Sequence, residues 1–301
     1  MKLVLYIGKD YPHHKNYSAI KRMCNSCGVE FEETRSIHRV MEDNYEILLS
    51  CSEYINPELI PSRIKIIFGP QFFVFPTGKI VGRRNEELSK RCVMNSLSKW
   101  VKDYWLEIAN EFIVPIEYFP FAVDTNLFEP LFLEKEFDCI IYIKHRSHTI
   151  INEVLNIVNQ KKMKYNIIVY GSYNEMDYIN LLQKSKFMIS LDAHESQGFG
   201  LEEAMSCNVP LLVMNATTMY DETNDGISPI YEHMKPKKLL ATSVPYWSDE
   251  CGIKITDISE LSESVVNMLE NYTKYTPRNY IVKTLSDEVC MKRILDYFKL
   301  I

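Results

Sequence analysis

The sequence predicts an α/β protein that contains two Rossmann-like domains. Short apolar runs alternate with segments of helical spacing along most of the 301 residues. An order of strand, helix and strand is typical of a parallel sheet that helices cover on both faces. The pattern restarts near residue 137, and a chain of this length usually forms about two domains. A restart of this kind favours two Rossmann-like domains over one long sheet.

The first half opens with an apolar run at residues 2–7 that ends at Gly8. A loop with His13 and His14 follows, and helical spacing begins near Ser18. The pattern predicts further buried strands at 45–50 and 64–68 and a helix at 85–102. Proline and polar residues then interrupt the periodicity at 115–130, where we place the linker.

The second half repeats the alternation. Helices are expected over 148–160, 175–184 and 201–207, with strands at 137–143, 166–171, 187–191 and 210–214. Two last helices are expected near 257–272 and 286–300. We therefore expect an N-terminal domain of residues 1–125 and a C-terminal domain of residues 126–301, whose last helix can also pack on the N-terminal domain.

The composition is that of a soluble globular protein, with 46% hydrophobic residues and a net charge of -6. An acidic balance argues against nucleic acid as the main partner, because phosphate binding normally needs a basic face. No apolar run approaches the roughly 20 residues that span a bilayer, and the first residues lack a signal-peptide pattern. We expect a cytoplasmic protein without a transmembrane segment, and attachment to the cytoplasmic face of a membrane stays open.

The eight cysteines are scattered, which favours reduced thiols over a disulfide framework. Cys24 and Cys27 form a lone CxxC, which we interpret as structural because no second pair accompanies it. Two aromatic groups stay open between sugar stacking and core packing. They are Phe72, Phe73 and Phe75 in the first half, and Tyr246 and Trp247 in the second.

An acid-rich turn, HESQGFGLEEAMSCNVP at residues 194–210, follows one predicted strand and opens a helix. Ligands of open α/β sheets bind beyond the carboxyl ends of the strands. Gly198, Phe199 and Gly200 would let the backbone approach a ligand, and the helix start attracts negative charge. Glu195 and Glu203 could accept hydrogen bonds from vicinal sugar hydroxyls or merely complement the helix dipole, whereas for Glu202 we favour the dipole.

Cations follow two other predicted strands. Lys144 and Arg146 end the strand at 137–143, where they either neutralise a leaving diphosphate or form a solvated charge run. His13, His14 and Lys15 follow the first strand, as residues of a ligand cleft or as surface residues. Asp192 ends the strand before the acid-rich turn, and we interpret it as a residue that caps or turns that loop.

Two motifs resemble a known family. HESQGFGLEEAMSCNVPLLV resembles the donor-site signature of retaining glycosyltransferases of family 4, in which two glutamates with seven residues between them lead into a segment like EAMACGxPVV. Glu195 and Glu203 have that spacing. Independently, FPFAVDTNLFEP at 119–130 resembles the interdomain segment PxGVDxxxFxP of that family, and it falls on the linker placed above.

The resemblance implies the GT-B fold, with two Rossmann-like domains facing each other across a cleft and, here, a short N-terminal domain. It implies retaining transfer of a sugar from a UDP- or GDP-linked donor to a glycan, lipid or protein acceptor, with no cofactor. The chain lacks the Asp-x-Asp motif that holds a metal in glycosyltransferases of the GT-A fold, so we expect no metal. The alternative is a relative that binds nucleotide sugars or glycans without catalysis.

The resemblance also implies roles for individual residues. Glu203 would bind the nucleotide ribose, Glu195 the sugar hydroxyls, and Lys144 with Arg146 the diphosphate. Further residues are expected on the donor side (Gly171, Gly198, Phe199, Gly200) and on the acceptor side (His13, His14, Lys15).

The chain departs from the family pattern at three places. Lys144 and Arg146 replace a GR…K pair at different spacing, and the GFG turn is shifted relative to the usual EGFG. Asn208 stands where the family has glycine, and asparagine tolerates the left-handed backbone that this turn needs. The loop after the first strand has one glycine, Gly8, where the family has several.

Overall fold

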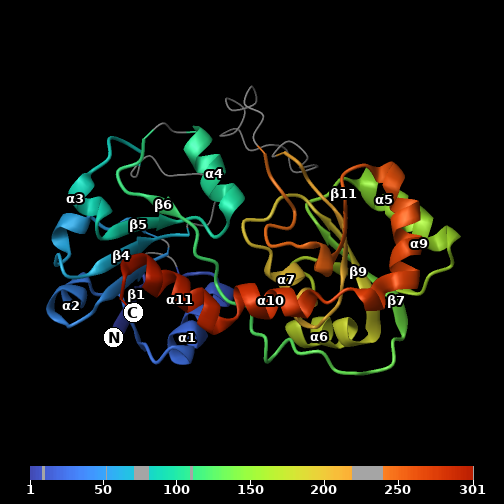
Figure 1. The fold of residues 1–301 in the computed structure, drawn as a ribbon, viewed down its shortest axis with the longest axis horizontal. Coiled ribbons are helices and arrows are strands. Elements are labelled where there is room, and N and C mark those ends of the chain that lie inside the picture. Colours follow the sequence, from blue (N-terminus) through green and yellow to red (C-terminus); the bar gives the residue numbers. More distant parts are fainter. Residues whose placement is uncertain (9–10, 52, 71–80, 109–110, 219–239, 301) are drawn as a thin grey trace. The chain divides into compact units, whose positions relative to one another are not determined.

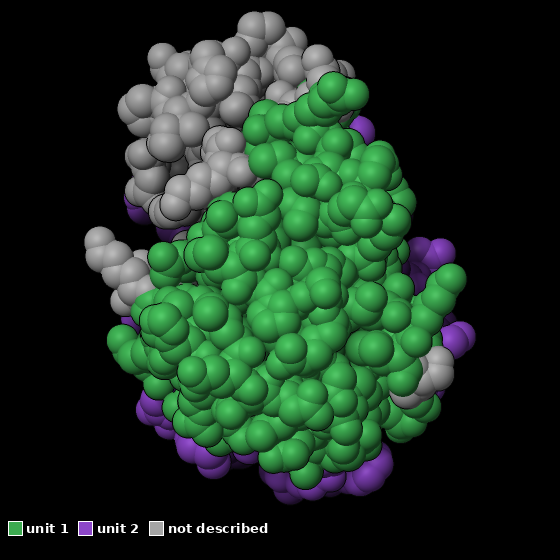
Figure 2. All heavy atoms as spheres, turned by 90° about the vertical axis from the view of Figure 1, so that its left-hand side faces the viewer, with its two compact units in different colours: residues 1–122, 285–301 green, residues 123–284 purple. Residues whose placement is uncertain are grey.

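The structure is a computed structural model that describes all residues except 9–10, 52, 71–80, 109–110, 219–239 and 301. The expected aromatic group Phe72, Phe73 and Phe75 lies outside the described residues. The chain divides into two compact units, coloured separately in Figure 2. Unit 1 comprises residues 1–122 and 285–301, and unit 2 comprises residues 123–284.

Unit 1 is built on a six-stranded sheet in the order β2-β1-β3-β4-β5-β6 (Figure 1). Every paired strand in it runs parallel to its neighbour. The strands are β1 (Lys2–Tyr6), β2 (Glu30–Thr34), β3 (Ile47–Ser50), β4 (Lys65–Phe68), β5 (Cys92–Asn95) and β6 (Ile116–Glu117). The helices are α1 (His14–Ser26), α2 (Ile37–Glu42), the 3-10 turn η1 (Pro57–Leu59), α3 (Glu86–Ser89), α4 (Lys99–Ile108) and α11 (Asp287–Phe298).

The last helix belongs to unit 1. Helix α11 packs against α1, and Arg22 of α1 joins the two helices through Asp287, with 3.3 Å between Nε and Oδ1. The sequence placed residues 126–301 in the second domain and left the packing of this helix open. In the structure residues 285–301 group with the N-terminal sheet.

Two expectations for unit 1 are wrong. The single helix expected at 85–102 is instead α3, strand β5 and the start of α4. All four residues of Cys92–Asn95 are buried, and the strand pairs with β4 and β6, so tertiary pairing overrides the local helical spacing. The first helix begins at His14 rather than near Ser18. The charged edge strand β2, EFEET, gave no apolar pattern by which it could be predicted.

Unit 2 is built on a five-stranded parallel sheet in the order β11-β10-β9-β7-β8. The strands are β7 (Phe137–Lys144), β8 (Tyr165–Val169), β9 (Ser185–Asp192), β10 (Leu211–Met214) and β11 (Gly252–Ile255). The helices are α5 (His148–Gln160), α6 (Glu175–Lys184), α7 (Phe199–Ser206), α9 (Leu261–Asn271) and α10 (Pro277–Leu285), with 3-10 turns η2 (Asp249–Cys251), η3 (Ile258–Glu260) and η4 (Tyr272–Lys274). The four strands expected here are present with small shifts, whereas β11 and α10 were not expected.

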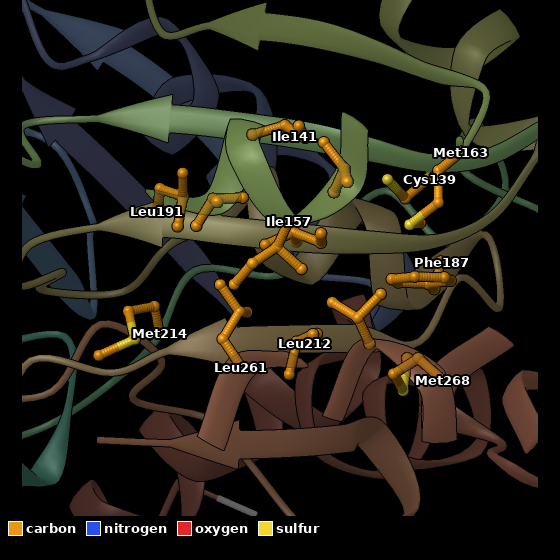
Figure 3. Close-up of a cluster of buried hydrophobic side chains, with 14 of the residues drawn as sticks. Cys139, Ile141, Ile157, Met163, Phe187, Leu191, Leu212, Met214, Leu261 and Met268 are labelled. Carbon is orange, nitrogen blue, oxygen red and sulfur yellow. The ribbon is translucent and has the colours of Figure 1, made fainter. Parts of the chain in front are cut away.

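The core of unit 2 shows why these segments fold together. Helices α5 and α9 cover one face of the sheet, where their buried side chains meet those of β7, β9 and β10 (Figure 3). Ile141, Ile189 and Leu212 point to this face. Residues that alternate with them, including Tyr142, point to the opposite face, where Tyr142 contacts Tyr178 of α6 and Gly200 of α7. Both faces of the sheet are therefore covered.

The two sheets share one topology. In each, the first strand lies between the second and the third, so the chain winds outward in both directions from the first and third strands. Open α/β sheets of this order bind ligands at that switch point, beyond the carboxyl ends of the strands. In unit 2 the switch point lies between β7 and β9, and it is there that Lys144, Asp192 and the acid-rich turn come together.

Candidate functional site at the β7–β9 switch point

Lys144 and Asp192 are the last residues of β7 and β9, and they are register partners in the sheet. Partners in parallel strands point to the same face, here the face of Tyr142 and α7. The chain leaves β9 through residues 193–198 and enters α7. This loop is anchored by the Glu195 N–H, which donates to the carbonyl of Thr242 at 3.0 Å.

Lys144 and Glu195 form an ion pair across the end of the sheet. The Lys144 side chain is 16% exposed and that of Glu195 13%. Burial disfavours the charge of both groups, but their charged and hydrogen-bonding neighbours together outweigh that penalty. The pKa of Lys144 is raised, mainly by the charge of Glu195, and the pKa of Glu195 is lowered, mainly by the charge of Lys144. Both groups are ionised at neutral pH, and Lys144 is not part of a solvated charge run.

Asp192 lies beside this pair and is 1% exposed. Burial, and next the charge of Glu195, raise its pKa well above the usual range. No side-chain N–H or O–H group in the described part of the chain donates a hydrogen bond to its oxygens, whereas the backbone N–H of Ala193 acts against burial and lowers its pKa. Asp192 ends β9 directly before the loop, as expected, and the Ala193 N–H supplies a backbone donor of the kind that a loop cap uses.

Arg146 is brought to the same edge by a left-handed residue. His145 has φ 50°, which turns the chain directly after β7. The Arg146 side chain is then buried, and its Nη1 donates to the carbonyl of Asp192 at 3.0 Å. The Ser243 hydroxyl donates to the same carbonyl at 3.0 Å. Arg146 thus places a second cation beside Lys144, and it too is not a solvated strand-end charge.

Two tyrosines, Tyr142 and Tyr178, contact the glycine turn at Gly200. Gly198 precedes α7 with φ 96°, a conformation that favours glycine. At Gly200 an added Cβ would lie 3.0 Å from the Tyr142 hydroxyl, and the Gly200 carbonyl accepts a hydrogen bond from the Tyr178 hydroxyl. Phe199, the first residue of α7, is partly exposed. The turn therefore needs small residues for packing as well as for access to a ligand.

The two glutamates of α7 are both buried. Glu202 is 1% exposed, and burial raises its pKa well above the usual range. Its Oε2 accepts a hydrogen bond from Gln197 at 3.0 Å. Glu202 lies in the first turn of α7, where the dipole interpretation placed it, and its burial disfavours the charged form that this interpretation needs. Glu203 is 4% exposed and follows it on the same helix.

Strand β8 adds an aromatic side chain to the edge. The ring of Tyr170 lies under the Lys144 ammonium, 4.3 Å from Nζ to the ring centroid, and the Tyr170 N–H donates to the carbonyl of Ile143. Gly171 follows with φ 77° and open space where a Cβ would lie. Lys144 is thus held between an acid on one side and a ring on the other.

Other expected residues lie elsewhere. His13 precedes α1 and His14 and Lys15 open it, in unit 1, with both histidines exposed. In unit 2, Tyr246 is buried and Trp247 is partly buried beside Lys254. Asn208 has φ 58°, the left-handed conformation expected for it. All eight cysteines are free thiols.

Two features of the fold bear on metals and membranes. The described residues contain no group of three or more histidine, cysteine, aspartate or glutamate side chains arranged to hold a metal ion. Among the described helices, none has both the length and the apolar composition that crossing a bilayer requires.

Sequence reasoning missed the contributions of Asp192, Tyr170 and Ser243 to this edge. Tyr170 follows a predicted strand just as Lys144 does, and that position was the available signal. Asp192 carried the same signal, because it ends a predicted strand. For Ser243 the sequence carried none, because its contact with the Asp192 carbonyl depends on how β9 and the loop before β11 meet.

No protein-family model and no curated protein matches this sequence. Solved structures do resemble the fold. Sucrose-phosphate synthase from Thermosynechococcus elongatus aligns over 100% of this chain and 98% of its own, with 8% identity and a TM-score of 0.57. The lipopolysaccharide outer core galactosyltransferase WaaB aligns over 100% of both chains, with 11% identity and a TM-score of 0.54.

A third similar structure is HepE from Anabaena, in complex with UDP and glucose. It aligns over 100% of both chains, with 9% identity and a TM-score of 0.53. At such identities the likeness concerns the fold. Two parallel-sheet units of matching topology, together with alignments along the whole chain, show that this protein has the GT-B fold.

Proposed function

We propose that this protein is a glycosyltransferase that moves a sugar from a nucleoside-diphosphate donor to an acceptor hydroxyl. The observation that carries the proposal is the Lys144–Glu195 pair at the β7–β9 switch point, with Arg146 beside it. This edge offers cations for a diphosphate and an ionised acid for sugar hydroxyls. The fold supports the same class, since the similar structure of HepE holds UDP and glucose.

Lys144 and Arg146 are assigned to the donor diphosphate. Negative charge develops on the leaving phosphate as the glycosidic bond breaks, and cations fixed in a poorly solvated site stabilise it strongly. The Lys144 ammonium has three N–H donors. It can therefore keep its contact with Glu195 while it donates to a phosphate oxygen.

Glu195 and Glu203 are assigned to hydroxyl groups. An ionised carboxylate accepts two hydrogen bonds from vicinal hydroxyls, and the lowered pKa of Glu195 keeps it ionised. We assign Glu195 to the transferred sugar and Glu203 to the ribose. The backbone of Gly171 and of Gly198, Phe199 and Gly200 completes the donor side, and the space that an absent side chain leaves is open at Gly171.

We further propose the retaining mechanism of family 4. The E-x7-E spacing of Glu195 and Glu203 and the interdomain motif support this assignment. The leaving phosphate would assist attack by the acceptor on the same face of the sugar, and Lys144, Arg146 and the N–H groups at the start of α7 would do what a divalent metal does in GT-A enzymes. The acceptor, a glycan, lipid or protein in the cytoplasm or at a membrane face, is assigned to unit 1, with His13, His14 and Lys15 as candidate contacts.

The test is a panel of UDP- and GDP-linked sugars with measurement of nucleoside diphosphate release. We expect release from at least one donor by the wild-type protein and its loss in Lys144→Ala. Lys186→Ala is the matched control, because Lys186 pairs with Asp138 at the opposite end of β7 and β9. Donor binding without release would favour a non-catalytic binding protein, and a wild type that neither binds nor cleaves any donor would overturn the proposal.

A further inference from the structure

Asp192 presents a chemical problem that the proposed roles do not solve. Asp192 is the register partner of Lys144 across β7 and β9, and its carboxyl is buried. Lys144 nevertheless pairs with Glu195. Neither oxygen of Asp192 accepts a hydrogen bond from a hydroxyl, ammonium or other side-chain donor of the described residues, although the Ala193 N–H lowers its pKa to a lesser extent than burial raises it. A buried carboxylate with so few donors is very unfavourable, and such a group neutralises instead.

The groups around Asp192 indicate how its buried carboxyl is accommodated. Lys144 and Tyr142 face it from β7, and Glu195 faces it from the loop that follows β9. His194 of the same loop interacts with Glu195. The hydrogen bonds that Arg146 and Ser243 donate to this residue go to its backbone carbonyl oxygen and not to its side chain. The side-chain group that faces the Asp192 carboxyl closely enough to share a proton with it is the carboxyl of Glu195. Two carboxylates repel each other, so this contact requires one proton between them.

We propose that Asp192 is a positioning residue that stays protonated at neutral pH and donates its proton to the Glu195 carboxylate. Glu195 is then held by Lys144 and by Asp192, each bonding to part of the same carboxylate. An O–H donor to a carboxylate is among the strong, short hydrogen bonds in proteins. The arrangement leaves the remaining lone pairs of Glu195 in a fixed direction for a ligand.

This division of charge also explains why the site tolerates two acids beside one lysine. With the proton on Asp192, Lys144 and Glu195 carry one positive and one negative charge, and Arg146 adds a second positive charge at the same edge. Ionised Asp192 would add a second negative charge where the diphosphate of a donor must approach. The part of the inference that concerns ligands rests on the proposed function, whereas the position of the proton does not.

The proton can be located in the free protein by carbon-13 NMR of labelled aspartate side chains. The Asp192 resonance is identified by its loss in Asp192→Asn. At pH 7 we expect it at the position of a protonated carboxylic acid. In Glu195→Gln we expect it to move to the ionised position, because Lys144 then loses its acid partner and pairs with Asp192.

One control variant and two outcomes test the protonation state proposed for Asp192. Glu202→Gln removes another buried acid without breaking the Lys144–Glu195 contact, and it should leave the Asp192 resonance unchanged. An ionised Asp192 in the wild type at pH 7 would overturn the proposal. So would an Asp192 resonance that stays protonated in Glu195→Gln, since Asp192 would then be neutral through burial alone.

Donor binding provides the functional readout, with UDP and the UDP-sugars of the panel as ligands. Asp192→Asn keeps a neutral donor for Glu195 and should bind within about threefold of wild type. Asp192→Ala removes the donor and should raise KM for the sugar donor by roughly tenfold with a smaller change in kcat. Equal losses in both variants would contradict the positioning role. A wild type that binds no nucleotide sugar would defeat the proposed function and leave the NMR test of the proton intact.

Discussion

The two ends of the β7–β9 strand pair carry ion pairs of opposite character. At the amino ends, Asp138 of β7 binds Lys186 of β9 at 2.7 Å, and their side chains are 24% and 31% exposed. One acid meets one base there, and Asp138 also accepts a hydrogen bond from the N–H of Lys164 at 2.9 Å. At the carboxyl ends, Lys144 faces two acids, Glu195 and Asp192, in a more buried setting.

The contrast between the two ends distinguishes an ordinary ion pair from a buried charge cluster of the kind found at functional sites. A partly solvated pair whose bonds are all satisfied is ordinary surface electrostatics and contributes little to folding. Two buried acids beside one lysine cost free energy, because the charges are desolvated and one acid must take a proton. Clustering of shifted pKa values in this way is typical of functional sites, and it occurs at the ligand-binding end of the strands.

The largest expected effect comes from removing the lysine at each end. Lys144→Ala leaves the buried Glu195 charge without its partner and should lower the free energy of unfolding by about 3 kcal/mol. It should also reduce sugar transfer by about 100-fold or more. Lys186→Ala should cost under about 1 kcal/mol and leave transfer unchanged. Urea unfolding and diphosphate release measure both, and equal effects of the two variants would erase the contrast between the ends.

The second effect is a pH dependence of opposite sign at the two ends. Asp192 has a raised pKa, so its contribution to stability is fully present below the unfolded pKa near 3.8 and is lost as pH rises toward the folded value. Relative to Asp192→Asn, wild type should lose up to about 1.4 kcal/mol per pH unit over that window.

Asp138 behaves in the reverse way. Burial works to raise its pKa, but the hydrogen bonds and charges of Lys186 and Lys164 together outweigh burial, and the pKa is lowered. Its contribution is present above the unfolded pKa and is lost as pH falls through the folded value. Relative to Asp138→Asn, wild type should therefore lose stability in acid. Urea unfolding at a series of pH values tests both ends, and the same sign at both would contradict the assigned protonation states.

A third effect separates the two buried glutamates of α7. Glu203→Ala removes a proposed ribose contact and should weaken UDP binding by roughly tenfold. Glu202→Gln replaces a neutral carboxyl by a neutral amide of the same shape and should stay within about twofold of wild type. Thermal-shift titration with UDP reports both affinities. A greater loss in Glu202→Gln than in Glu203→Ala would reverse their roles.

The smallest expected effect concerns the ring under Lys144. Tyr170 is partly exposed, and a cation–π contact at such a site contributes about 0.5–1 kcal/mol. Tyr170→Leu should therefore raise KM for the sugar donor by about threefold, whereas Tyr170→Phe keeps the ring and should match wild type. Steady-state kinetics distinguish them. If Tyr170→Phe loses as much as Tyr170→Leu, the hydroxyl rather than the ring face matters.

Much of unit 2 could be predicted because its signals are local. Helices α5 and α6 lie at the residues expected from the sequence, each opened by a side chain, Ser147 or Asn174, that caps the first turn. In unit 1 the helix expected at 85–102 failed, because strand β5 within it is defined by pairing with β4 and β6. Strand pairing joins distant residues and leaves a weak trace in a four-residue segment.

Local patterns in the sequence were enough to identify the residues at the carboxyl ends of the strands. A strand end or a glycine turn can be recognised from the residues next to it in the chain. Lys144, Arg146, Glu195 and the Gly198–Gly200 turn were all found in this way. The tertiary structure alone decided their charge states. Lys144 and Glu195 are 51 positions apart in the chain, and their contact, like the burial of Asp192 and Glu202, arises from strand register and from the packing of α7. Because desolvation and neighbouring charges set a pKa, an excess of acids in the sequence could not reveal which of them keep their protons.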